Sequence, residues 1–556
     1  MLSCILLGLL VAGCDSTQPA DTVDEEKRFS ERSPAHTPGS AAPDAVLAPE
    51  YGGRIITGSI GEASNLIYPL ASDSASHEIA DLLYIAPLKY DKDLQIIPWA
   101  AENYEVLQEG RLLRFTLRKG MLWQDGKEVT AEDAEFTYKL MIDPKTPTAY
   151  AENFKVIKEF KVIDRYTFEV AYERPYAPAL TTWMSGLLPK HVLKGENLLS
   201  TRYSRDPVGA GPYRLKEWIP GQRVTLVARD DYFEGRPYLD EVVFRIIPDM
   251  STMFLELKSG NLDWMGLTPQ QYLFQTQGKQ WEKDYRKFKY LSFGYTYLGY
   301  NLSNPLFTDV RVRQALAHAI NKQEIIKGVL LGLGVPTIGP YKPGTWMYNE
   351  KIVDYVYDPN KAKTLLAEAG WRDSNGDGLL EKDKTTFSFT ILTNQGNEMR
   401  VKAATIIQSR LKEIGIEVKI RTVEWAAFLK EFVDKRQFDA LILGWSISQD
   451  PDIYEVWHSS KAMPGGLNHV GYSNHELDAL LDDGRHTLDQ GRRKEIYDRV
   501  QEIFHRDQPY CFLFVPYALP IIQSRFQGIE PASSGLTWNF IRWWTPKSAQ
   551  RVERIQ

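Results

Sequence analysis

Residues 117–140 read LRKGMLWQDGKEVTAEDAEFTYKL, and the second half of this stretch predicts the start of a helix. Thr130 is a suitable helix N-cap, and Asp133, three residues later, has the position of a capping-box acid. The apolar residues that follow fit helical spacing moderately well: Ala134, Phe136, Tyr138 and Leu140. We therefore expect a helix to begin at Thr130.

Strand and helix patterns alternate on both sides of this stretch. Residues 53–58 have the β-branched composition of a strand, and residues 402–415 have helical spacing that ends in a Gly-Ile-Glu-Val step into a strand. Residues 437–443 are almost continuously apolar, with Asp439 as the only polar interior residue, which is typical of a buried strand. Such alternation predicts α/β lobes, and a chain of 556 residues is long enough for two or more.

The composition is that of an ordinary globular protein, with 43% hydrophobic and 25% charged residues. A net charge of −6 is not the excess of basic residues that is typical of nucleic-acid-binding proteins, so we expect no nucleic-acid partner. Aromatic residues are abundant: 14 Trp, 29 Tyr and 23 Phe. They indicate either aromatic core packing or a cleft lined with flat rings that holds a ligand.

The N-terminus resembles an export signal. The apolar run 5–11 is too short to span a bilayer, so it is interpreted as the hydrophobic region of a signal peptide. It ends in Leu10-Val11-Ala12-Gly13-Cys14, which resembles a bacterial lipobox in which the Cys14 thiol carries the lipid. No Lys or Arg precedes the run, which places the expected true start upstream of Met1.

The segment that follows Cys14 is rich in Ser, Thr, Pro, Ala and Asp up to about residue 49, and we expect a flexible tether there. A lipid anchor, a tether and a large body form the layout of a surface receptor. We expect a lipoprotein on the periplasmic face of the inner membrane or on the cell surface. Sorting rules of some Gram-negative bacteria would retain it at the inner membrane, because Asp15 follows the Cys.

Five segments, of which the first belongs to the stretch quoted above, follow one another in the chain. They are 117–120 with Trp123, 125–126 and 130–133; 208–213 with Trp218, Gly221, 231–232 and 235–240; Asn301 with 309–315; 357–359 with 369–371; and 443–445 with 450–452 and 457–460. Each segment alone is weak evidence. In this order, over roughly residues 50–540, they resemble the bacterial extracellular solute-binding proteins of family 5, which include the dipeptide- and oligopeptide-binding receptors of ABC importers.

The resemblance implies an α/β fold of two lobes joined by a hinge, the periplasmic-binding-protein fold, with an extra subdomain inserted in the first lobe. The expected division is a signal peptide 1–13, a lipidated tether 14–49, first-lobe segments 50–94 and 205–297, the inserted subdomain 95–204, the second lobe 298–518, and a return to the first lobe over 519–556.

The resemblance also implies a function. A monomeric receptor would capture a peptide-like solute between its lobes and deliver it to the permease subunits of an ABC importer, with no cofactor and no catalysis. Relatives with this fold also carry oligosaccharides or nickel chelates, so a non-peptide solute is an alternative. An exported hydrolase that uses dispersed acids is a remote alternative, because no local catalytic motif is present.

Two segments would hold the ligand if it pairs with the protein like a β-strand. By resemblance they are Glu62, Ala63 and Ser64, after the first strand, and a second-lobe segment that comprises Gly444, Trp445, Ser446, Ile447 and Ser448. The Trp445 ring would form a flat wall of the cleft. Its alternative role is that of a core residue at the end of a buried strand.

The sequence departs from the family pattern just beyond Trp445. Peptide receptors of this family often have an Asp there that binds the α-ammonium group of the peptide, but the first acid in this chain is Asp450. Either Asp450 takes this role through a rearranged loop, or the anchor is absent. Asp450 also suits the start of a turn in Asp450-Pro451-Asp452.

Residues 373–378, DSNGDG, resemble the opening of a calcium loop, with candidate ligands Asp373, Asn375 and Asp377. Position twelve of the loop is Lys384 where the pattern requires Glu, although Glu381 is nearby. The main interpretation is a hairpin rich in turn residues, with no metal.

Overall fold

The computed structural model describes residues 48–71, 73–447 and 449–551. Residues Pro49–Gln556 form one compact unit. The predicted signal peptide, the lipidation residue Cys14, nearly all of the tether, and Ser448 lie outside the described residues. Within the described part, no helix is long and apolar enough to cross a bilayer.

One lobe is built on a seven-stranded sheet in which β1 pairs in parallel with both of its neighbours. The strands, in spatial order, are β12 (Tyr285–Lys287), β22 (Pro520–Gln523), β11 (Trp264–Gly266), β1 (Arg54–Ser59), β10 (Glu241–Ile246), β9 (Arg223–Ala228) and β8 (Tyr213–Ile219). Helix α1 (Ser74–Leu83) packs on this lobe through Ile79, Ala80 and Leu83. We call this part lobe I.

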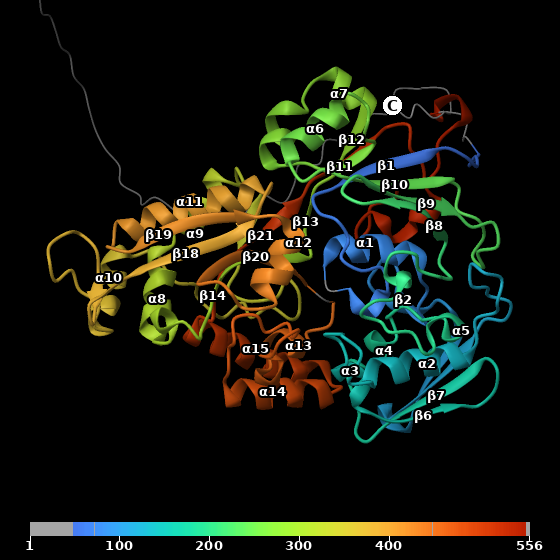
Figure 1. Ribbon diagram of the computed structural model, residues 1–556, viewed down its shortest axis with the longest axis horizontal. Coiled ribbons are helices and arrows are strands. Elements are labelled where there is room, and N and C mark those ends of the chain that lie inside the picture. The colour runs from blue at the N-terminus through green and yellow to red at the C-terminus, as the bar shows by residue number, and fades with distance from the viewer. Residues whose placement is uncertain (1–47, 72, 448, 552–556) are drawn as a thin grey trace, which may run out of the picture. The chain divides into compact units, whose positions relative to one another are not determined.

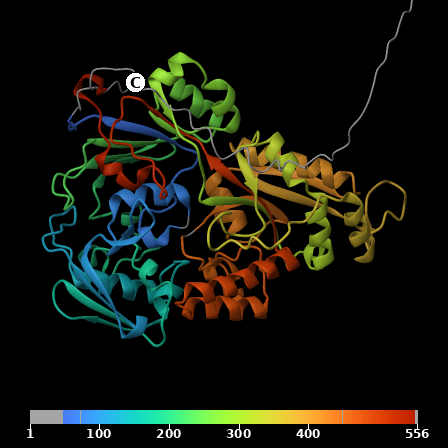
Figure 2. The ribbon, with the colours of Figure 1, turned by 180° about the vertical axis from the view of Figure 1, so that it is seen from behind.

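The other lobe, lobe II, is built on a second seven-stranded sheet. Its strands are β13 (Tyr290–Leu291), β21 (Tyr510–Ala518), β14 (Gly294–Tyr300), β20 (Ala440–Ser446), β18 (Ser388–Asn394) and β19 (Glu417–Val423), with β15 (Gly334–Pro336) beside β21. Figure 2 shows the two large sheets on opposite sides of the structure.

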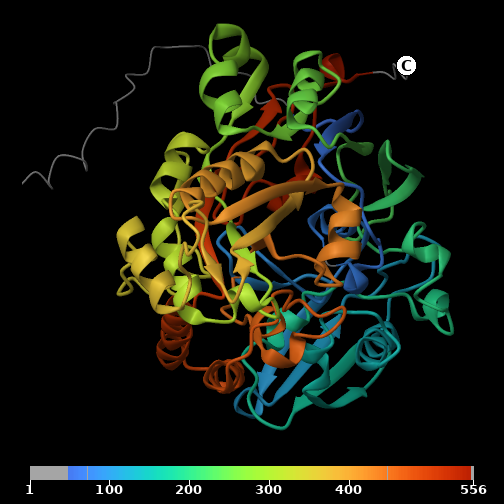
Figure 3. The same cartoon turned by 60° about the vertical axis from the view of Figure 1, so that its left-hand side comes forward.

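Both faces of the lobe II sheet are covered, which explains the apolar run of β20. Ala440 and Ile442 belong to one core cluster, and Leu441 and Leu443 belong to the cluster on the opposite face. The helices of this lobe are α8 (Val310–Ala319), α9 (Lys322–Gly328), α10 (Pro359–Glu368), α11 (Glu398–Lys412), α12 (Trp425–Ala427), α13 (Tyr454–Trp457), α14 (His475–His486) and α15 (Gln490–Asp507). Figure 3 shows α11 across one face of the sheet.

A separate antiparallel sheet has the order β4 (Ala101–Leu107), β5 (Leu112–Leu117), β7 (Thr167–Tyr172) and β6 (Ile157–Val162). Helices α2 (Ala131–Ile142), α3 (Glu152–Lys155), α4 (Ala179–Thr182) and α5 (Lys190–Leu193) belong to the same stretch of chain. With its own aromatic core around Phe115, Phe168 and Trp183, it forms what we call the four-stranded unit (Figure 1).

The chain passes between the two large sheets at two short crossings. Strand β12 of lobe I ends at Lys287 and β13 of lobe II begins at Tyr290. Strand β21 of lobe II ends at Ala518, and β22 of lobe I begins at Pro520, so that Leu519 alone connects them. Two short, adjacent connections are the architecture of a hinge. The fold is therefore α/β and two-lobed, as the sequence indicated.

The predicted helix start is confirmed, whereas the predicted strand 437–443 is displaced. Helix α2 begins after Thr130, and the Asp133 carboxylate accepts a hydrogen bond from the Thr130 backbone N–H at 2.9 Å. Strand β20 begins at Ala440, so Asp439 lies outside the strand. Its carboxylate instead accepts hydrogen bonds from Thr390 N and Asn304 Nδ2, each at 3.0 Å, which satisfies a charge that a buried strand interior would leave unpaired.

Candidate functional site

A cavity of about 980 Å³ lies where the two lobes and the four-stranded unit meet. Its size is at the upper end of the usual range for small-molecule sites. Lobe I contributes one face of α1 and the residues before it, and the four-stranded unit contributes Tyr150, part of α3 and the end of α4. Lobe II contributes the ends of β14 and β20 and the segment that follows β20.

The end of β20 at the cavity has one strand partner instead of two. Along its whole length β20 pairs with β14, from Tyr300↔Ala440 to Gly294↔Ser446. On its other side it pairs with β18 only at Ala440 and Leu441. The main-chain groups on that side of Gly444–Ser446 therefore have no β-ladder partner among the described strands, and these residues line the cavity.

Close packing at Gly444 excludes a side chain. A Cβ atom there would lie 2.9 Å from the Tyr295 carbonyl oxygen and 3.2 Å from an Arg400 nitrogen. Because the first neighbour is backbone, the clash could not be relieved by a rotamer change. The glycine therefore keeps the β20 backbone close to the Arg400 guanidinium at the cavity wall.

Trp445 and His469 form a flat aromatic surface in the cavity wall. Their rings are parallel to within 2°, with centroids 5.5 Å apart. Burial lowers the pKa of His469 to about 4, so the ring is neutral at pH 7. Trp445 is half-buried, and its Nε1 lies 3.4 Å from Tyr510 Oη. This arrangement combines the two roles expected for Trp445, because the ring ends a buried strand and also lines the cavity.

The cavity wall contains one arginine, Arg400, near the start of α11. Burial lowers its pKa to about 10, so it remains charged at neutral pH. Its NH1 donates to Asn394 Oδ1 at 2.7 Å, and no carboxylate oxygen lies within 4.0 Å of it among the described residues. A ligand carboxylate or carbonyl would therefore find an available donor here.

Acidic side chains outnumber basic ones in the wall; they are Asp73, Glu78, Asp81, Asp434, Asp450, Asp452 and Glu455. Two of these are paired behind the wall: Asp450 accepts two hydrogen bonds from Arg493, both at 2.8 Å, and Asp452 accepts one from Arg485 at 3.0 Å. Such bidentate and charge-assisted contacts fix a side chain in place.

Polar contacts join lobe II to the four-stranded unit at one edge of the cavity. The Lys461 ammonium lies 2.9 Å from Glu152 Oε1, and the Ala177 N–H donates to the Arg485 carbonyl at 2.7 Å. The His486 ring nitrogen Nδ1 lies 3.0 Å from the Pro175 carbonyl. These contacts stabilise the arrangement in which the lobes enclose the cavity.

The predicted ligand-binding residues divide into two groups. Gly444, Trp445, Ser446, Ile447 and Asp450 all line the cavity. Glu62, Ala63 and Ser64 do not.

The structure explains the position of this first segment. Ala63 is buried in the core of lobe I, and Glu62 accepts a hydrogen bond from Trp218 Nε1 at 2.7 Å. Ser64 N–H donates to Ser76 Oγ at 2.8 Å. The segment thus supports the N-terminal end of α1, whose own residues form the wall.

Several wall residues have no counterpart among the predicted ones. They include Arg400, His469 and the residues of α1 that face the cavity, Ser74, His77, Glu78 and Asp81. The positions 74, 77, 78 and 81 have the spacing of one helix face, which is visible in the sequence. That spacing also fits a helix face in bulk water, so it does not by itself indicate a site.

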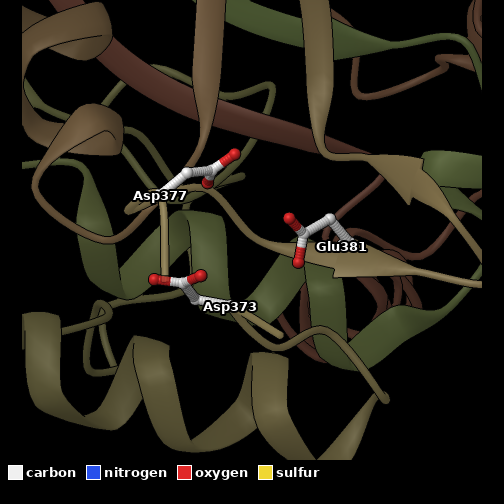
Figure 4. A group of neighbouring side chains, drawn as sticks. All are labelled: Asp373, Asp377 and Glu381. Atoms are coloured by element: carbon white, nitrogen blue, oxygen red, sulfur yellow. The ribbon is translucent and has the colours of Figure 1, made fainter. Parts of the chain in front are cut away.

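The predicted calcium-loop residues lie together at an exposed turn, and none of them lines the cavity. Carboxylate oxygens of Asp373, Asp377 and Glu381 lie within 4.8 Å of one another (Figure 4). The Asp373 carboxylate accepts hydrogen bonds from Gly376 N and Gly378 N at 2.7 and 3.0 Å. These are turn contacts, so a hairpin without metal stays the prediction, and calcium binding at Asp373, Asn375 and Asp377 stays its alternative.

Comparison with known proteins assigns a family. Residues 95–464 match the family model for bacterial extracellular solute-binding proteins, family 5. The oligopeptide-binding protein AppA of Bacillus subtilis strain 168 is 36% identical over 522 residues, which cover 91% of this chain and 94% of that protein.

Two solved structures show the same architecture. The structure of Bacillus subtilis AppA in complex with a nonapeptide has a TM-score of 0.86 at 35% identity, over 90% of this chain and all of that one. NikZ of Campylobacter jejuni in complex with Ni(L-His) has a TM-score of 0.81 at 25% identity, over 88% of this chain and 99% of that one.

These relatives are binding proteins, so this chain is a solute-binding protein and not an enzyme. The two-lobed fold and the cavity between the lobes agree with that assignment. The chain belongs to the bacterial extracellular solute-binding proteins, family 5.

Proposed function

We propose that this protein captures a peptide in the cavity between its lobes and delivers it to the permease of an ABC importer. The observation that carries the proposal is the unpaired side of β20 at the cavity wall. A peptide in extended conformation would pair there with Gly444–Ser446, and backbone hydrogen bonds would supply affinity for many sequences. Support comes from a relative 35% identical in sequence whose structure contains a nonapeptide.

The charges of the wall suit a zwitterionic ligand. Arg400 offers the ligand carboxylate a guanidinium that has no carboxylate partner among the described residues, and the acidic residues offer sites for an ammonium group. Asp450 remains our hypothesis for the α-ammonium anchor. Its carboxylate accepts two hydrogen bonds from Arg493 and one from the Asp452 N–H, so an ammonium group would have to share or replace these contacts.

The Asp450 hypothesis has a direct test. The variant Asp450→Asn should bind free-amine peptides about tenfold more weakly and N-acetylated peptides as well as the wild type does. Calorimetric titration measures both affinities. Unchanged affinity for the free-amine peptide would refute the hypothesis.

We propose further that Cys14 carries the lipid that holds this receptor, a monomer, at the membrane surface. The proposal rests on the lipobox-like sequence 10–14 and on the tether composition of the residues that follow. In a bacterial host, the variant Cys14→Ser should move the protein from the membrane fraction to the soluble fraction. An unchanged distribution would contradict the lipid anchor.

Mass spectrometry of solutes that co-purify with the protein tests the peptide proposal. A set of peptides that share no single side chain is the expected result, because main-chain pairing does not depend on sequence. Recovery of a metal complex or a sugar in place of peptides would overturn it. A nickel chelate is the second candidate, because a relative 25% identical in sequence was solved with Ni(L-His).

A further inference from the structure

One side of the cavity is bordered by the polar face of helix α1. Ser74, His77, Glu78 and Asp81 of α1 line the cavity, while Ile79, Ala80 and Leu83 on the opposite face are buried in the lobe I core. Glu78 and Asp81 both expose side-chain surface to the cavity. We call residues 74, 77, 78 and 81 the α1 face.

Among the described residues, neither carboxylate of the α1 face forms a close ion pair, although Asp81 interacts with the Tyr68 hydroxyl and with the nearby His77. No Lys, Arg or His nitrogen of the described residues lies within 4.0 Å of either Glu78 or Asp81. Like charges three residues apart on a helix repel one another. Asp450 and Asp452, in the same wall, are each paired with an arginine.

The titration of Glu78 reflects these surroundings. Limited hydration, followed by the negative charges of Asp81 and Asp73, raises its pKa to about 7. The other titratable groups around the cavity near this face are His77, Tyr68, Tyr150 and Glu455.

A further carboxylate approaches the same part of the cavity from lobe II. Both carboxylate oxygens of Glu455, on α13, are buried, and neither accepts a hydrogen bond from a described residue. The nearest cation is Lys461, whose ammonium lies 3.6 Å from Oε2. Burial, then the charges of Glu455 and Asp73, raise the pKa of Tyr150 to about 12, so this ring lies near carboxylates of both lobes. A buried carboxylate with unused acceptor positions indicates a missing donor.

Aromatic rings lie beside the acids. The His77 ring lies 5.2 Å from that of Tyr68 and 6.5 Å from that of Tyr150, both at steep angles, and all three residues line the cavity. The π-faces of tyrosine attract ammonium and guanidinium groups. Carboxylates next to tyrosine rings form a set of groups that suits a cation with an aliphatic stem.

We propose that the α1 face, with Glu455 opposite, binds a positively charged side chain of the peptide, the ammonium of lysine or the guanidinium of arginine. The protein would therefore select peptides by charge at this subsite. This inference rests on the proposed function, that the cavity holds a peptide. The charge-selective subsite adds to the main-chain pairing at β20, which does not depend on the side chains of the peptide.

The test uses three pools of free-amine peptides that differ at one position, which is Lys, Gln or Glu. Because the terminal ammonium is common to all pools, differences between them report the side chain alone. The variant is Glu78→Gln with Asp81→Asn. The control is Asp483→Asn with Glu495→Gln, two exposed acids outside the cavity wall, so that both proteins lose the same net charge.

We expect the wild type and the control to retain the Lys pool at least about tenfold more tightly than the Gln pool, and the Glu pool least. In the double variant, the preference for Lys should fall to within about twofold. Equal binding of the Lys and Gln pools by the wild type, or an unchanged preference in the variant, would overturn the subsite. Equal weakening of all pools would overturn it as well, because the acids would then serve the common terminal ammonium.

A titration with spermidine separates the subsite from the peptide proposal. If no pool binds, the peptide function fails. The subsite then stands if spermidine binds the wild type and binds the double variant at least about tenfold more weakly. It falls if spermidine fails to bind or binds both proteins equally.

Discussion

The ion pair between Lys461 and Glu152 joins lobe II to the four-stranded unit, so it is lost when the lobes separate. The atoms Nζ and Oε1 are 2.9 Å apart, and the side chains are 11% and 25% exposed. The variant Glu152→Gln removes the charge and keeps the shape. Lys461 retains Glu455 at 3.6 Å, so no buried cation is left entirely without a counter-charge.

The magnitude follows from the degree of burial. At an effective dielectric constant of 20, two unit charges 3 Å apart attract by about 5 kcal/mol, and most of this is offset by desolvation. Exposed pairs contribute about 0–1 kcal/mol, and breaking a fully buried pair costs about 3–5 kcal/mol. This partly exposed pair should stabilise the closed form by about 1–2 kcal/mol. The dissociation constant for the ligand should therefore rise about five- to thirtyfold.

The chain provides a matched control for this experiment. Lys155 pairs with the same Glu152 at 2.8 Å, but within one helix of the four-stranded unit. The variant Lys155→Met should change affinity by less than about twofold, because exposed pairs of this kind contribute little. Calorimetric titration gives the affinity, and small-angle X-ray scattering with and without ligand reports lobe separation. Equal effects of Glu152→Gln and Lys155→Met would refute the role of the interlobe pair.

Three further outcomes are expected. The variant Trp445→Ala removes the flat ring that stacks on His469 and should weaken peptide binding about tenfold, as measured by calorimetry. The control Trp538→Ala removes an exposed ring outside the cavity wall and should leave the affinity unchanged, so equal effects of the two variants would contradict a role of Trp445 in binding. Because the pKa of Glu78 is raised to about 7, its carboxyl group is mostly protonated at pH 6 and mostly ionised at pH 8. The affinity for Lys peptides should therefore rise between pH 6 and pH 8, while the affinity for Gln peptides stays level. Affinities for both peptides that do not change with pH would contradict binding of the cationic side chain at the α1 face. Calcium titration should give no saturable heat, since the Asp373 oxygens already accept backbone N–H groups, and saturable binding that Asp373→Asn abolishes would reinstate the metal loop.

Local sequence signals predicted the secondary structure correctly where residues close together in the sequence form the hydrogen bonds that end an element. The capping box at Thr130 and Asp133 fixed the start of α2 because the two residues bond to each other. The apolar run of β20 predicted a buried strand, but its bounds depend on pairing with β14, which extends to Ser446. Asp439 looked like part of the strand because its partners, Thr390 and Asn304, are distant in sequence.

The candidate site was predictable only where a family pattern exists. Resemblance indicated Gly444–Ile447 and Asp450, and these residues line the cavity. Arg400 was missed because an arginine near the start of a helix is ordinary in sequence. Its closeness to Gly444 depends on the packing of α11 against the sheet, which no local pattern encodes.

The spacing of the charged residues on α1 does not reveal that they line a cavity. Glu78 and Asp81 have the spacing of any solvated helix surface, and only the approach of lobe II turns that surface into a cavity wall. The acids of α1 belong to lobe I, whereas Arg400 belongs to lobe II. A peptide with a cationic side chain and a carboxylate could therefore bond to both lobes at once. Because it could make both contacts only when the lobes are together, its charges would favour closure as well as affinity.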